Sequence, residues 1–553
     1  MKLLNQLLNE QDSQHLSLVK NDQDPPLQVP QSSPVIETIK SWLVSQLAER
    51  LELDTHEIDI ERDFTDYGLN SIEVVNLSGE LENLLGRRLP PTLLLDYPTI
   101  EALAEYLVED TSQDTGPNLQ RPSESQVKIP VSEEEAEVLT SNPMAEAEEI
   151  PLEYYNFDLY PEYLQLQKQL AEINSTGIGN PFFIPQERIN NNTTFIGGRE
   201  LINYATYNYL GMCGDPMVSD AAKEAIDHYG TSVSASRLLS GEKPLHQELE
   251  REIADFIGVE DSIVYVGGHA TNVTTISHLF GQNDLILHDS LSHNSIFQGC
   301  LLSGATIIAF PHNDWQALDR LLRDRRHRYK RVLIAIEGVY STDGDIPDLP
   351  KFIEIKKSHK AFLMVDEAHS IGTIGKQGRG ISEYFGISPT NVDLWMGTLS
   401  KSFASCGGYI AGSKALVEYL KYTSPGFVYS VGISPPDTAS VLAAIRLLKT
   451  EPERVAQLQQ RSRLFLQCAR ERGLNTGMSK DSPVIPIIVG ESIKSVLLSQ
   501  NLFKRGINVP FMFYPSVPQN AARLRFFITC NHTEEQIRFT IDALAEELKK
   551  MGI

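Results

Sequence analysis

The sequence of 553 residues predicts a large α/β domain preceded by a small all-α domain. A chain of this length exceeds what one compact core usually holds, so we expect several domains. After residue 151, apolar β-branched runs alternate with amphipathic helical patterns, and this order indicates a largely parallel sheet. Between residues 35 and 108 the apolar positions recur at helical spacing instead, which predicts the all-α domain.

Composition narrows the class of protein. The formal charge of -25 argues against a nucleic-acid partner, because there is no excess of Lys and Arg to neutralise phosphates. The five cysteines are scattered without CxxC spacing, so neither a zinc site nor a disulfide framework is indicated. No segment reaches the roughly 20 apolar residues of a membrane span, and MKLLNQLLNEQDSQ at the N-terminus lacks the apolar region of a secretory signal. We therefore expect a soluble, cytoplasmic protein without a metal site.

The N-terminal part divides where the composition shifts. We expect a flexible N-terminus over residues 1–34 and a helical domain over 35–108, in which ETIKSWLVSQLAERL and TIEALAEYLVE have helix spacing. Residues 109–150 are rich in acidic, Ser, Pro and Gln residues and nearly free of aromatics, which is typical of a disordered linker.

The remainder, residues 151–553, carries the α/β pattern. The expected strands are SIVYV, LILH, TIIAF, VLIAIE, AFLMVDEA and YIAGS. From about Ser413 the chain continues with helices and the short apolar runs VIPIIV and LRFFITC, which indicate a smaller α+β lobe.

In the helical domain, Gly68-Leu69-Asn70-Ser71-Ile72 places a hydroxyl at the start of a predicted helix. A helix N-terminus favours a phosphate attached to such a side chain. An ordinary N-cap serine explains the local sequence equally well.

The wider segment favours the first interpretation. From DFTDYGLNSIEVV through LPPTLLLDYPTIEALAEYL it resembles a four-helix acyl carrier protein of the polyketide-synthase type, with Asn70 where most carriers have Asp. The resemblance implies that Ser71 carries 4'-phosphopantetheine, attached by a phosphopantetheinyl transferase. A degenerate carrier that is never loaded stays an alternative.

In the α/β domain three blocks follow one another: YVGGHATN around Gly268, AFLMVDEAHSIG around Asp366, and TLSKSFASCGGYIAGS around Lys401. A carboxylate at the end of a buried strand, followed by a lysine in a Ser/Gly-rich loop, suits pyridoxal 5'-phosphate. The lysine would form a Schiff base with the cofactor, and the carboxylate would pair with the pyridinium nitrogen. The helix after Gly267 would receive the phosphate at its N-terminus. Taken singly, a helix cap, a surface lysine and an ordinary turn would explain these residues.

Together and in order, these blocks resemble the fold-type I pyridoxal-phosphate enzymes, and specifically the α-oxoamine synthases, across nearly all of the chain after residue 200. The resemblance extends through YATYNYLGM, HDSLSHNSIFQG, EGVYSTDGDIPDLP and AARLRFFITCNHT. It implies a decarboxylative condensation of an amino acid with an acyl thioester, which gives an α-aminoketone, CO2 and free thiol.

The resemblance also assigns site residues. It implies that Lys401 holds the cofactor, that Asp366 pairs with the ring nitrogen and that His293 stacks on the ring. The other cofactor contacts that it implies are His369, Ser341, Thr398, Gly268 and His269.

For the substrate, the resemblance assigns the amino-acid carboxylate to Arg525, a task that suits a planar two-pronged donor. Arg523, two positions away, is expected to be structural. Ser516 and Asn208 are placed near the same pocket.

The two resemblances together predict that acyl groups carried at Ser71 are substrates of the attached synthase. A flexible linker of about 40 residues has an r.m.s. span of roughly 35 Å, and such a tether supplies an effective concentration on the order of millimolar. Upstream polyketide-synthase or fatty-acid-synthase enzymes are expected partners, and the resemblance implies a homodimer.

Three alternatives differ in class. An aminotransferase would share Lys401 and Asp366, and a non-catalytic partner subunit would typically lack the lysine. In the third alternative, the synthase uses free acyl-CoA and the carrier serves another protein. The sequence leaves the amino acid, the acyl chain and the pathway open.

Overall fold

The computed structural model describes residues 33–51, 54–62, 64, 77, 81, 99–109, 150–175, 180–513, 516–518 and 520–552. The chain divides into two compact units, Met1–Leu77 with Leu93–Phe183 and Ser78–Thr92 with Ile184–Ile553. The domain limits expected at residues 34, 108 and 150 stay predictions.

The first unit contains two of the helices that the periodicity predicts, α2 (Ser33–Leu51) and α5 (Ile100–Glu109). Leu43 and Leu47 of α2 and Leu103 of α5 are completely buried, so apolar residues at helical spacing form a small core here. Ser71 and its motif lie outside the described residues. The other elements of this unit are η1 (Thr55–Glu57), η3 (Leu152–Tyr154), η4 (Phe157–Leu159) and α7 (Pro161–Ser175).

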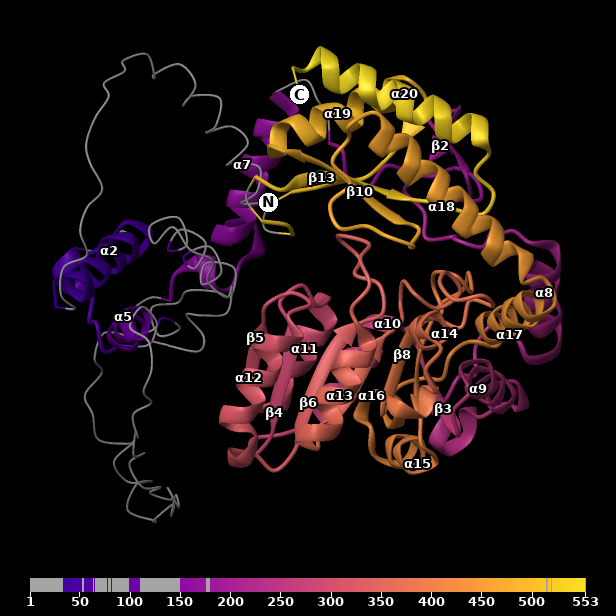
Figure 1. Ribbon diagram of the computed structural model, residues 1–553, viewed down its shortest axis with the longest axis horizontal. Helices are drawn as coiled ribbons and strands as arrows, with labels where there is room; N and C mark the ends of the chain where they lie inside the picture. The colour runs from indigo at the N-terminus through magenta and orange to yellow at the C-terminus, as the bar shows by residue number, and fades with distance from the viewer. Residues whose placement is uncertain are drawn as a thin grey trace. The chain divides into compact units, whose positions relative to one another are not determined.

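The second unit is built on a seven-stranded sheet with the order β3-β9-β8-β7-β6-β4-β5 (Figure 1). Neighbouring strands from β8 to β5 are parallel, and β9 runs antiparallel to both of its neighbours. The prediction of a largely parallel sheet is confirmed, although β8 was not among the predicted strands. The strands are β3 (Asp261–Tyr265), β4 (Leu285–Asp289), β5 (Thr306–Phe310), β6 (Val332–Glu337), β7 (Phe362–Asp366), β8 (Leu394–Thr398) and β9 (Gly408–Gly412).

Both faces of this sheet are buried, which explains the uninterrupted apolar strands. In β6, Ile334 and Ile336 face one core, while Leu333 and Ala335 face the other. Each fully buried large aliphatic side chain stabilises the fold by about 1.5–3 kcal/mol. Helices α9 (Pro244–Ile257), α12 (Trp315–Arg325), α13 (Leu349–His359) and α17 (Pro435–Thr450) contribute to the first core. Helices α10 (Gly268–Leu279), α11 (Asn294–Ser303) and α15 (Lys414–Thr423) contribute to the second.

A smaller lobe completes the unit. In Figure 1, helices α18 (Glu453–Glu471), α19 (Ser492–Lys504) and α20 (Glu534–Lys550) lie over one side of its strands. One three-stranded sheet has the order β10-β13-β12, with β10 (Val484–Gly490), β12 (Phe511–Met512) and β13 (Ala522–Phe527). The other has the order β1-β2-β11, with β1 (Thr193–Ile196), β2 (Arg199–Asn203) and β11 (Ile507–Asn508).

The sequence predicts this lobe only after about Ser413. The structure adds β1 and β2, which precede the large sheet in the chain, because Ile202 pairs in parallel with Ile507. The remaining elements of the unit are α8 (Pro216–Tyr229), η5 (Arg237–Gly241), η6 (Arg326–Arg328), α14 (Ile381–Phe385), η7 (Pro389–Asn391) and α16 (Pro425–Val428). In the part of the chain that the structure describes, no helix combines the length and the apolar character needed to cross a membrane.

Candidate active site

Polar side chains gather where the parallel strands end. Asp289, Glu337, Asp366 and Thr398 are the last residues of β4, β6, β7 and β8, and all four are buried. Because the carboxyl ends of parallel strands meet at one edge of a sheet, this edge is where a ligand site is expected.

Asp366 is fixed by two hydrogen bonds. Asn272 Nδ2 of α10 donates to Asp366 Oδ2 over 2.8 Å, and the Ala368 backbone N–H donates to Oδ1 over 2.9 Å. Donors on both oxygens compensate a negative charge and fix the direction of the carboxylate. Such a carboxylate can keep a proton on a nearby ring nitrogen, which is the role that the sequence analysis expects of Asp366.

Lys401 lies in the loop that follows β8, and its amine contacts the imidazole of His369. Lys401 Nζ lies 2.9 Å from His369 Nε2, and His369 Nδ1 lies 2.7 Å from Tyr209 Oη. Burial lowers the pKa of the Lys401 amine to about 8, against the opposing charges of Asp366 and Glu337. Burial, followed by the charge of Lys401, also holds the pKa of His369 well below its usual value, so this ring is neutral. An amine with a pKa of about 8 exchanges protons readily near neutral pH.

His293 precedes α11, and the backbone orients it. Its backbone N–H donates to Glu337 Oε1 over 2.6 Å, and its Nδ1 accepts from the Ser295 backbone N–H over 3.2 Å. Burial lowers the pKa of His293, which favours the neutral ring. Because Nδ1 accepts, the proton of the neutral ring lies on Nε2. Burial and the neighbouring charge of Asp366 raise the pKa of Glu337 well above its usual value.

A phosphate cradle, formed by Gly267, Gly268, Thr398 and Ser400, lies at the start of α10. The N-cap residue Gly267 supplies no side chain to cap the first turn, so the N–H groups at this helix end are available to an anion. A Cβ at Gly268 would lie 2.7 Å from Thr398 Oγ1, and Thr398 Oγ1 lies 2.8 Å from Ser400 Oγ. His269 is the second residue of the helix and is exposed. Glycine, two hydroxyls and a helix end together fit a phosphate group.

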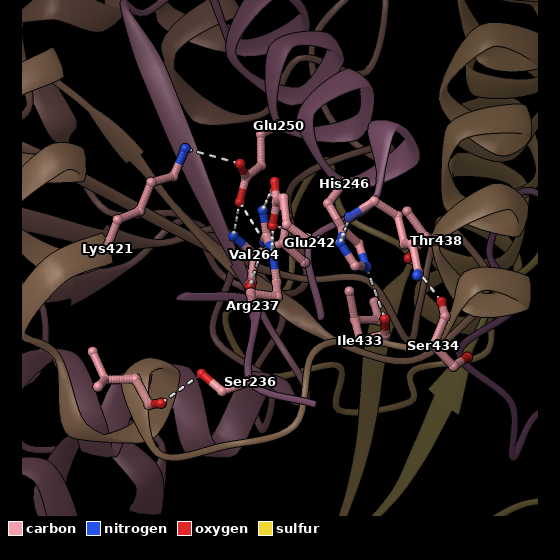
Figure 2. Close-up of polar contacts among 12 residues, drawn as sticks. Ser236, Arg237, Glu242, His246, Glu250, Val264, Lys421, Ile433, Ser434 and Thr438 are labelled. Atoms are coloured by element: carbon pink, nitrogen blue, oxygen red, sulfur yellow. Dashed lines mark hydrogen bonds and ion pairs between the residues drawn. The ribbon is translucent and has the colours of Figure 1, made fainter. Parts of the chain in front are cut away.

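An ion-pair network centred on the buried Arg237 and Glu250 contacts β3, the strand that leads to Gly267 (Figure 2). Arg237 Nη1 lies 2.7 Å from Glu250 Oε1, and Arg237 Nε lies 2.6 Å from Glu242 Oε2. Glu250 Oε1 also accepts from the Val264 N–H over 3.0 Å, which fixes β3 just before the glycine turn. Lys421 Nζ completes the network 2.8 Å from Glu250 Oε2.

The segment 428–433 is held by hydrogen bonds from the same region. His246 Nε2 lies 2.9 Å from the Ile433 carbonyl oxygen, and Ser236 Oγ donates to the Val428 carbonyl oxygen over 2.7 Å (Figure 2). A Cβ at Gly407 would lie 2.9 Å from Ile433 Cδ1. Contacts from this region thus fix β3 just before Gly267 and the segment 428–433.

Replacing Arg237 with alanine should lower the free energy of unfolding of the catalytic unit by about 3 kcal/mol, because removing one partner of a buried pair leaves its carboxylates poorly compensated. Denaturant titration followed by fluorescence measures this change. Arg446→Ala is the matched control, since Arg446 pairs with Glu248 and the side chains are 51% and 40% exposed. Its effect should stay within about 1 kcal/mol. Equal effects of the two substitutions would refute the structural importance of the buried network.

Arg525 projects from β13 beside the same site. Its Nη1 donates to the Ser341 carbonyl oxygen over 2.8 Å, and its Cζ lies 4.6 Å from the centre of the Phe527 ring. Arg525 Nε is buried and has no hydrogen-bond partner among the described residues. A guanidinium with an unused buried N–H can take a carboxylate. Arg523 behaves differently: it is 4% exposed and its Nη1 lies 2.5 Å from Asp343 Oδ1.

Two residues predicted to lie near the substrate differ from Arg525 in their contacts. The Asn208 amide is used within the backbone, donating to the Asn190 carbonyl oxygen over 3.1 Å and accepting from the Cys213 N–H over 3.0 Å. This side chain therefore holds loops together. Ser516 lies on an exposed bend, where its N–H donates to the Phe513 carbonyl oxygen over 3.0 Å.

Several neighbours of the site were not predicted from the sequence. Tyr207 places its ring centre 5.4 Å from Lys401 Nζ, and Asn272 binds Asp366. Glu337 ends a strand in the same way as Asp366 does, so the same signal could have identified it. Glu337 and Asp366 are paired in register across β6 and β7.

Taken together, the donor set fits pyridoxal 5'-phosphate. The cradle at Gly268 suits its phosphate, Asp366 suits its ring nitrogen, and the Lys401 amine suits its aldehyde. The residues that suit the cofactor come from distant parts of the chain, and the fold brings them together.

Comparisons with known proteins agree with this arrangement. The family model described as aminotransferase class I and II matches residues 199–544, and the model described as phosphopantetheine attachment site matches residues 41–107. The chain is 38% identical to the 8-amino-7-oxononanoate synthase of Symbiobacterium thermophilum, over 65% of this chain and 91% of that protein. It is 39% identical to serine palmitoyltransferase 3 of Caenorhabditis elegans, over 63% of this chain and 71% of that protein.

A solved structure gives the same result. The serine palmitoyltransferase of Sphingomonas wittichii matches with a TM-score of 0.68 and 32% identity, covering 71% of this chain and 99% of that one. The chain therefore belongs to the aminotransferase class I and II family, in which it is an α-oxoamine synthase joined to a phosphopantetheine attachment domain.

Proposed function

We propose that this enzyme condenses an amino acid with an acyl group carried as a thioester on its own phosphopantetheine domain. The observation that carries the proposal is the fusion itself. Residues 41–107 match a phosphopantetheine attachment site, and residues 199–544 match the aminotransferase class I and II family, in which the relatives named above are α-oxoamine synthases. A domain that presents thioesters is thus joined to an enzyme that consumes an acyl group.

The cofactors are pyridoxal 5'-phosphate in the synthase and 4'-phosphopantetheine on the carrier domain. When bound, pyridoxal phosphate supplies an electron sink that stabilises negative charge at the amino-acid α-carbon. Lys401 would hold it covalently, and Asp366 would keep a proton on its ring nitrogen. The residues expected to complete its site are His293, His369, Ser341, Thr398, Gly268 and His269.

The remaining steps belong to the chain's own side chains. Arg525 would bind the amino-acid carboxylate through its unused Nε–H, because a planar guanidinium pairs well with a carboxylate. Lys401 would remove the α-proton, since the lowered pKa of its amine, about 8, leaves a useful fraction of free base at neutral pH. His369, neutral and 2.9 Å from Lys401 Nζ, would orient that amine.

In the overall reaction, a carbon–carbon bond forms between the α-carbon and the acyl carbonyl carbon, and the thiol leaves. The bond to the carboxylate then breaks and releases CO2, and a proton returns to the α-carbon. The products are an α-aminoketone, CO2 and the free thiol. Release of CO2 distinguishes this reaction from simple transamination.

We expect the active enzyme to be a homodimer. Leu239 on η5 and Tyr429 after α16 are 85% and 86% exposed. The segments that carry them are joined by the Ser236–Val428 hydrogen bond, and Gly426 of α16 packs against Thr274 of α10, the helix that begins at the cradle. Large exposed apolar side chains beside a site favour coverage by a second copy of the chain.

Discharge of the carrier tests the proposed function. The full chain would be loaded with a phosphopantetheinyl transferase and an acyl-CoA, and the acyl group would be followed by intact mass. Addition of the correct amino acid should release the acyl group with CO2, and serine is the first candidate because two relatives are serine palmitoyltransferases. If the chain loads but does not discharge, while free acyl-CoA is condensed, the carrier serves another protein and the proposal is wrong.

A further inference from the structure

A buried Asp–His–Asp cluster joins Asp289, at the end of β4, to His312 and Asp345, two residues to which the proposed mechanism gives no role. His312 Nδ1 lies 2.8 Å from Asp289 Oδ1, and His312 Nε2 lies 2.9 Å from Asp345 Oδ2. The three side chains are 13%, 0% and 8% exposed in the order His312, Asp289, Asp345. With a carboxylate oxygen at each ring nitrogen, both nitrogens donate and the ring is an imidazolium.

The charge of this ring follows from its neighbours. Burial alone would lower the pKa of His312, but its hydrogen bonds to Asp289 and Asp345 raise it to about 10. Asn313 adds a backbone N–H that donates to Asp289 Oδ2 over 2.8 Å. The cluster is therefore a single cation between two buried anions, and removing the cation would leave the anions facing each other.

One arm of the cluster holds the loop 289–293. Asp289 Oδ1 accepts from the Leu291 N–H over 2.8 Å, and the Asp289 carbonyl oxygen accepts from the Ser292 N–H over 2.9 Å. The loop ends at His293, one of the residues assigned to the cofactor. His312 is thus connected to one side of the active site.

The other arm holds the turn 340–345. The Tyr340 N–H donates to the Asp345 carbonyl oxygen over 3.1 Å, and the Gly344 N–H donates to the Tyr340 carbonyl oxygen over 2.8 Å. The turn also carries the Ser341 carbonyl oxygen, which accepts from Arg525 Nη1 over 2.8 Å. A displacement of this turn would therefore redirect the Arg525 guanidinium.

We propose that His312 is a positioning residue that aligns Arg525 with the amino-acid carboxylate by clamping the turn 340–345 to the loop 289–293. This inference rests on the proposed role of Arg525. His312 acts through the backbone, by fixing the segment that carries His293 and the segment whose Ser341 carbonyl holds the guanidinium.

The test compares His312→Asn with wild-type holoenzyme. The amino-acid Kd is measured from the change in cofactor absorbance when serine or another accepted amino acid is added, without any acyl donor. We expect the Kd to rise about tenfold, because small displacements of a positioning group weaken aligned contacts strongly. The KM for a free acyl-CoA donor should change less than about twofold.

His359→Asn is the matched control. His359 Nε2 lies 2.7 Å from Asp319 Oδ1, and the side chain is 14% exposed, close to the 13% of His312. It joins α13 to α12 rather than the two segments of the clamp. We expect a lower Tm in both variants, with the larger drop in His312→Asn because His312 has two carboxylate partners, but an unchanged amino-acid Kd for His359→Asn. Equal Kd values in the two variants would overturn the proposal.

Two further variants keep the test decisive. If His312→Asn does not fold, Asp345→Asn keeps a hydrogen-bond acceptor while removing one charge, and it should raise the amino-acid Kd by about threefold or more. A wild-type Kd in Asp345→Asn would refute the positioning role. Arg525→Ala separates the two hypotheses: if it leaves the amino-acid Kd unchanged, the proposed role of Arg525 fails. If it abolishes binding while the His312 variant binds normally, only the positioning inference fails.

Discussion

Lys401→Ala should lower turnover by at least about 10³-fold, because it removes both the covalent attachment of the cofactor and the base that takes the α-proton. The amine lies 2.9 Å from His369 Nε2 and has no substitute among the described residues of the site. The variant should also lose the yellow absorbance of the lysine-linked cofactor. Steady-state assays with free acyl-CoA and an absorbance spectrum measure the two effects.

Lys356→Ala is the control for this substitution. Lys356 Nζ lies 2.7 Å from Asp393 Oδ2, and its side chain is 14% exposed, so it is a partly buried lysine outside the site. Its replacement should leave the absorbance and the turnover near wild type. Turnover that persists in Lys401→Ala would show that the assignment of the lysine is wrong.

Ser71→Ala should abolish product formation from carrier-bound acyl groups, because the hydroxyl that receives the phosphopantetheine is removed. Ser71 lies within the match at residues 41–107, and Lys401 lies within the separate match at residues 199–544. The cofactor absorbance, amino-acid binding and condensation of any free acyl-CoA should therefore be unchanged. Intact mass after treatment with a phosphopantetheinyl transferase measures loading, and product analysis measures condensation.

Ser78→Ala provides the matched control in the same matched segment, since Ser78 lies outside the Gly68–Ile72 motif. It should load and discharge like the wild type. Loading of Ser71→Ala would place the attachment at another residue. Carrier-dependent product from an unloaded Ser71→Ala chain would contradict the proposed route.

Much of the fold could be predicted because the parallel strands are buried on both faces. Runs such as VLIAIE are apolar almost throughout, and β6 is buried at every position. The strand β8 reads LWMGT, with few β-branched residues, so its pattern was too weak although all five residues are buried. The small lobe was placed incompletely, because parallel pairing of Ile202 with Ile507 joins positions far apart in the chain.

Prediction of the site from the sequence had a similar limit. The order of Gly268, Asp366 and Lys401 along the chain pointed to one chemistry, and the fold brings their elements to one edge of the sheet. The direction of a side chain could not be predicted in this way. The prediction that Asn208 lies near the pocket gave no direction for its amide, which contacts the backbone, and Tyr207, whose ring lies near Lys401, was not predicted. Periodicity and spacing do not contain that information.

The turn 340–345 also restricts motion between the large sheet and the small lobe. At Gly344 the φ angle is +68°, and a Cβ there would collide with the Val484 carbonyl oxygen of β10. Ser482 Oγ donates to the Gly344 carbonyl oxygen over 2.7 Å, and Asp343 pairs with Arg523 of β13. A hinge motion that swung the small lobe away from the large sheet would have to break these contacts together. These contacts should therefore oppose opening between the two lobes.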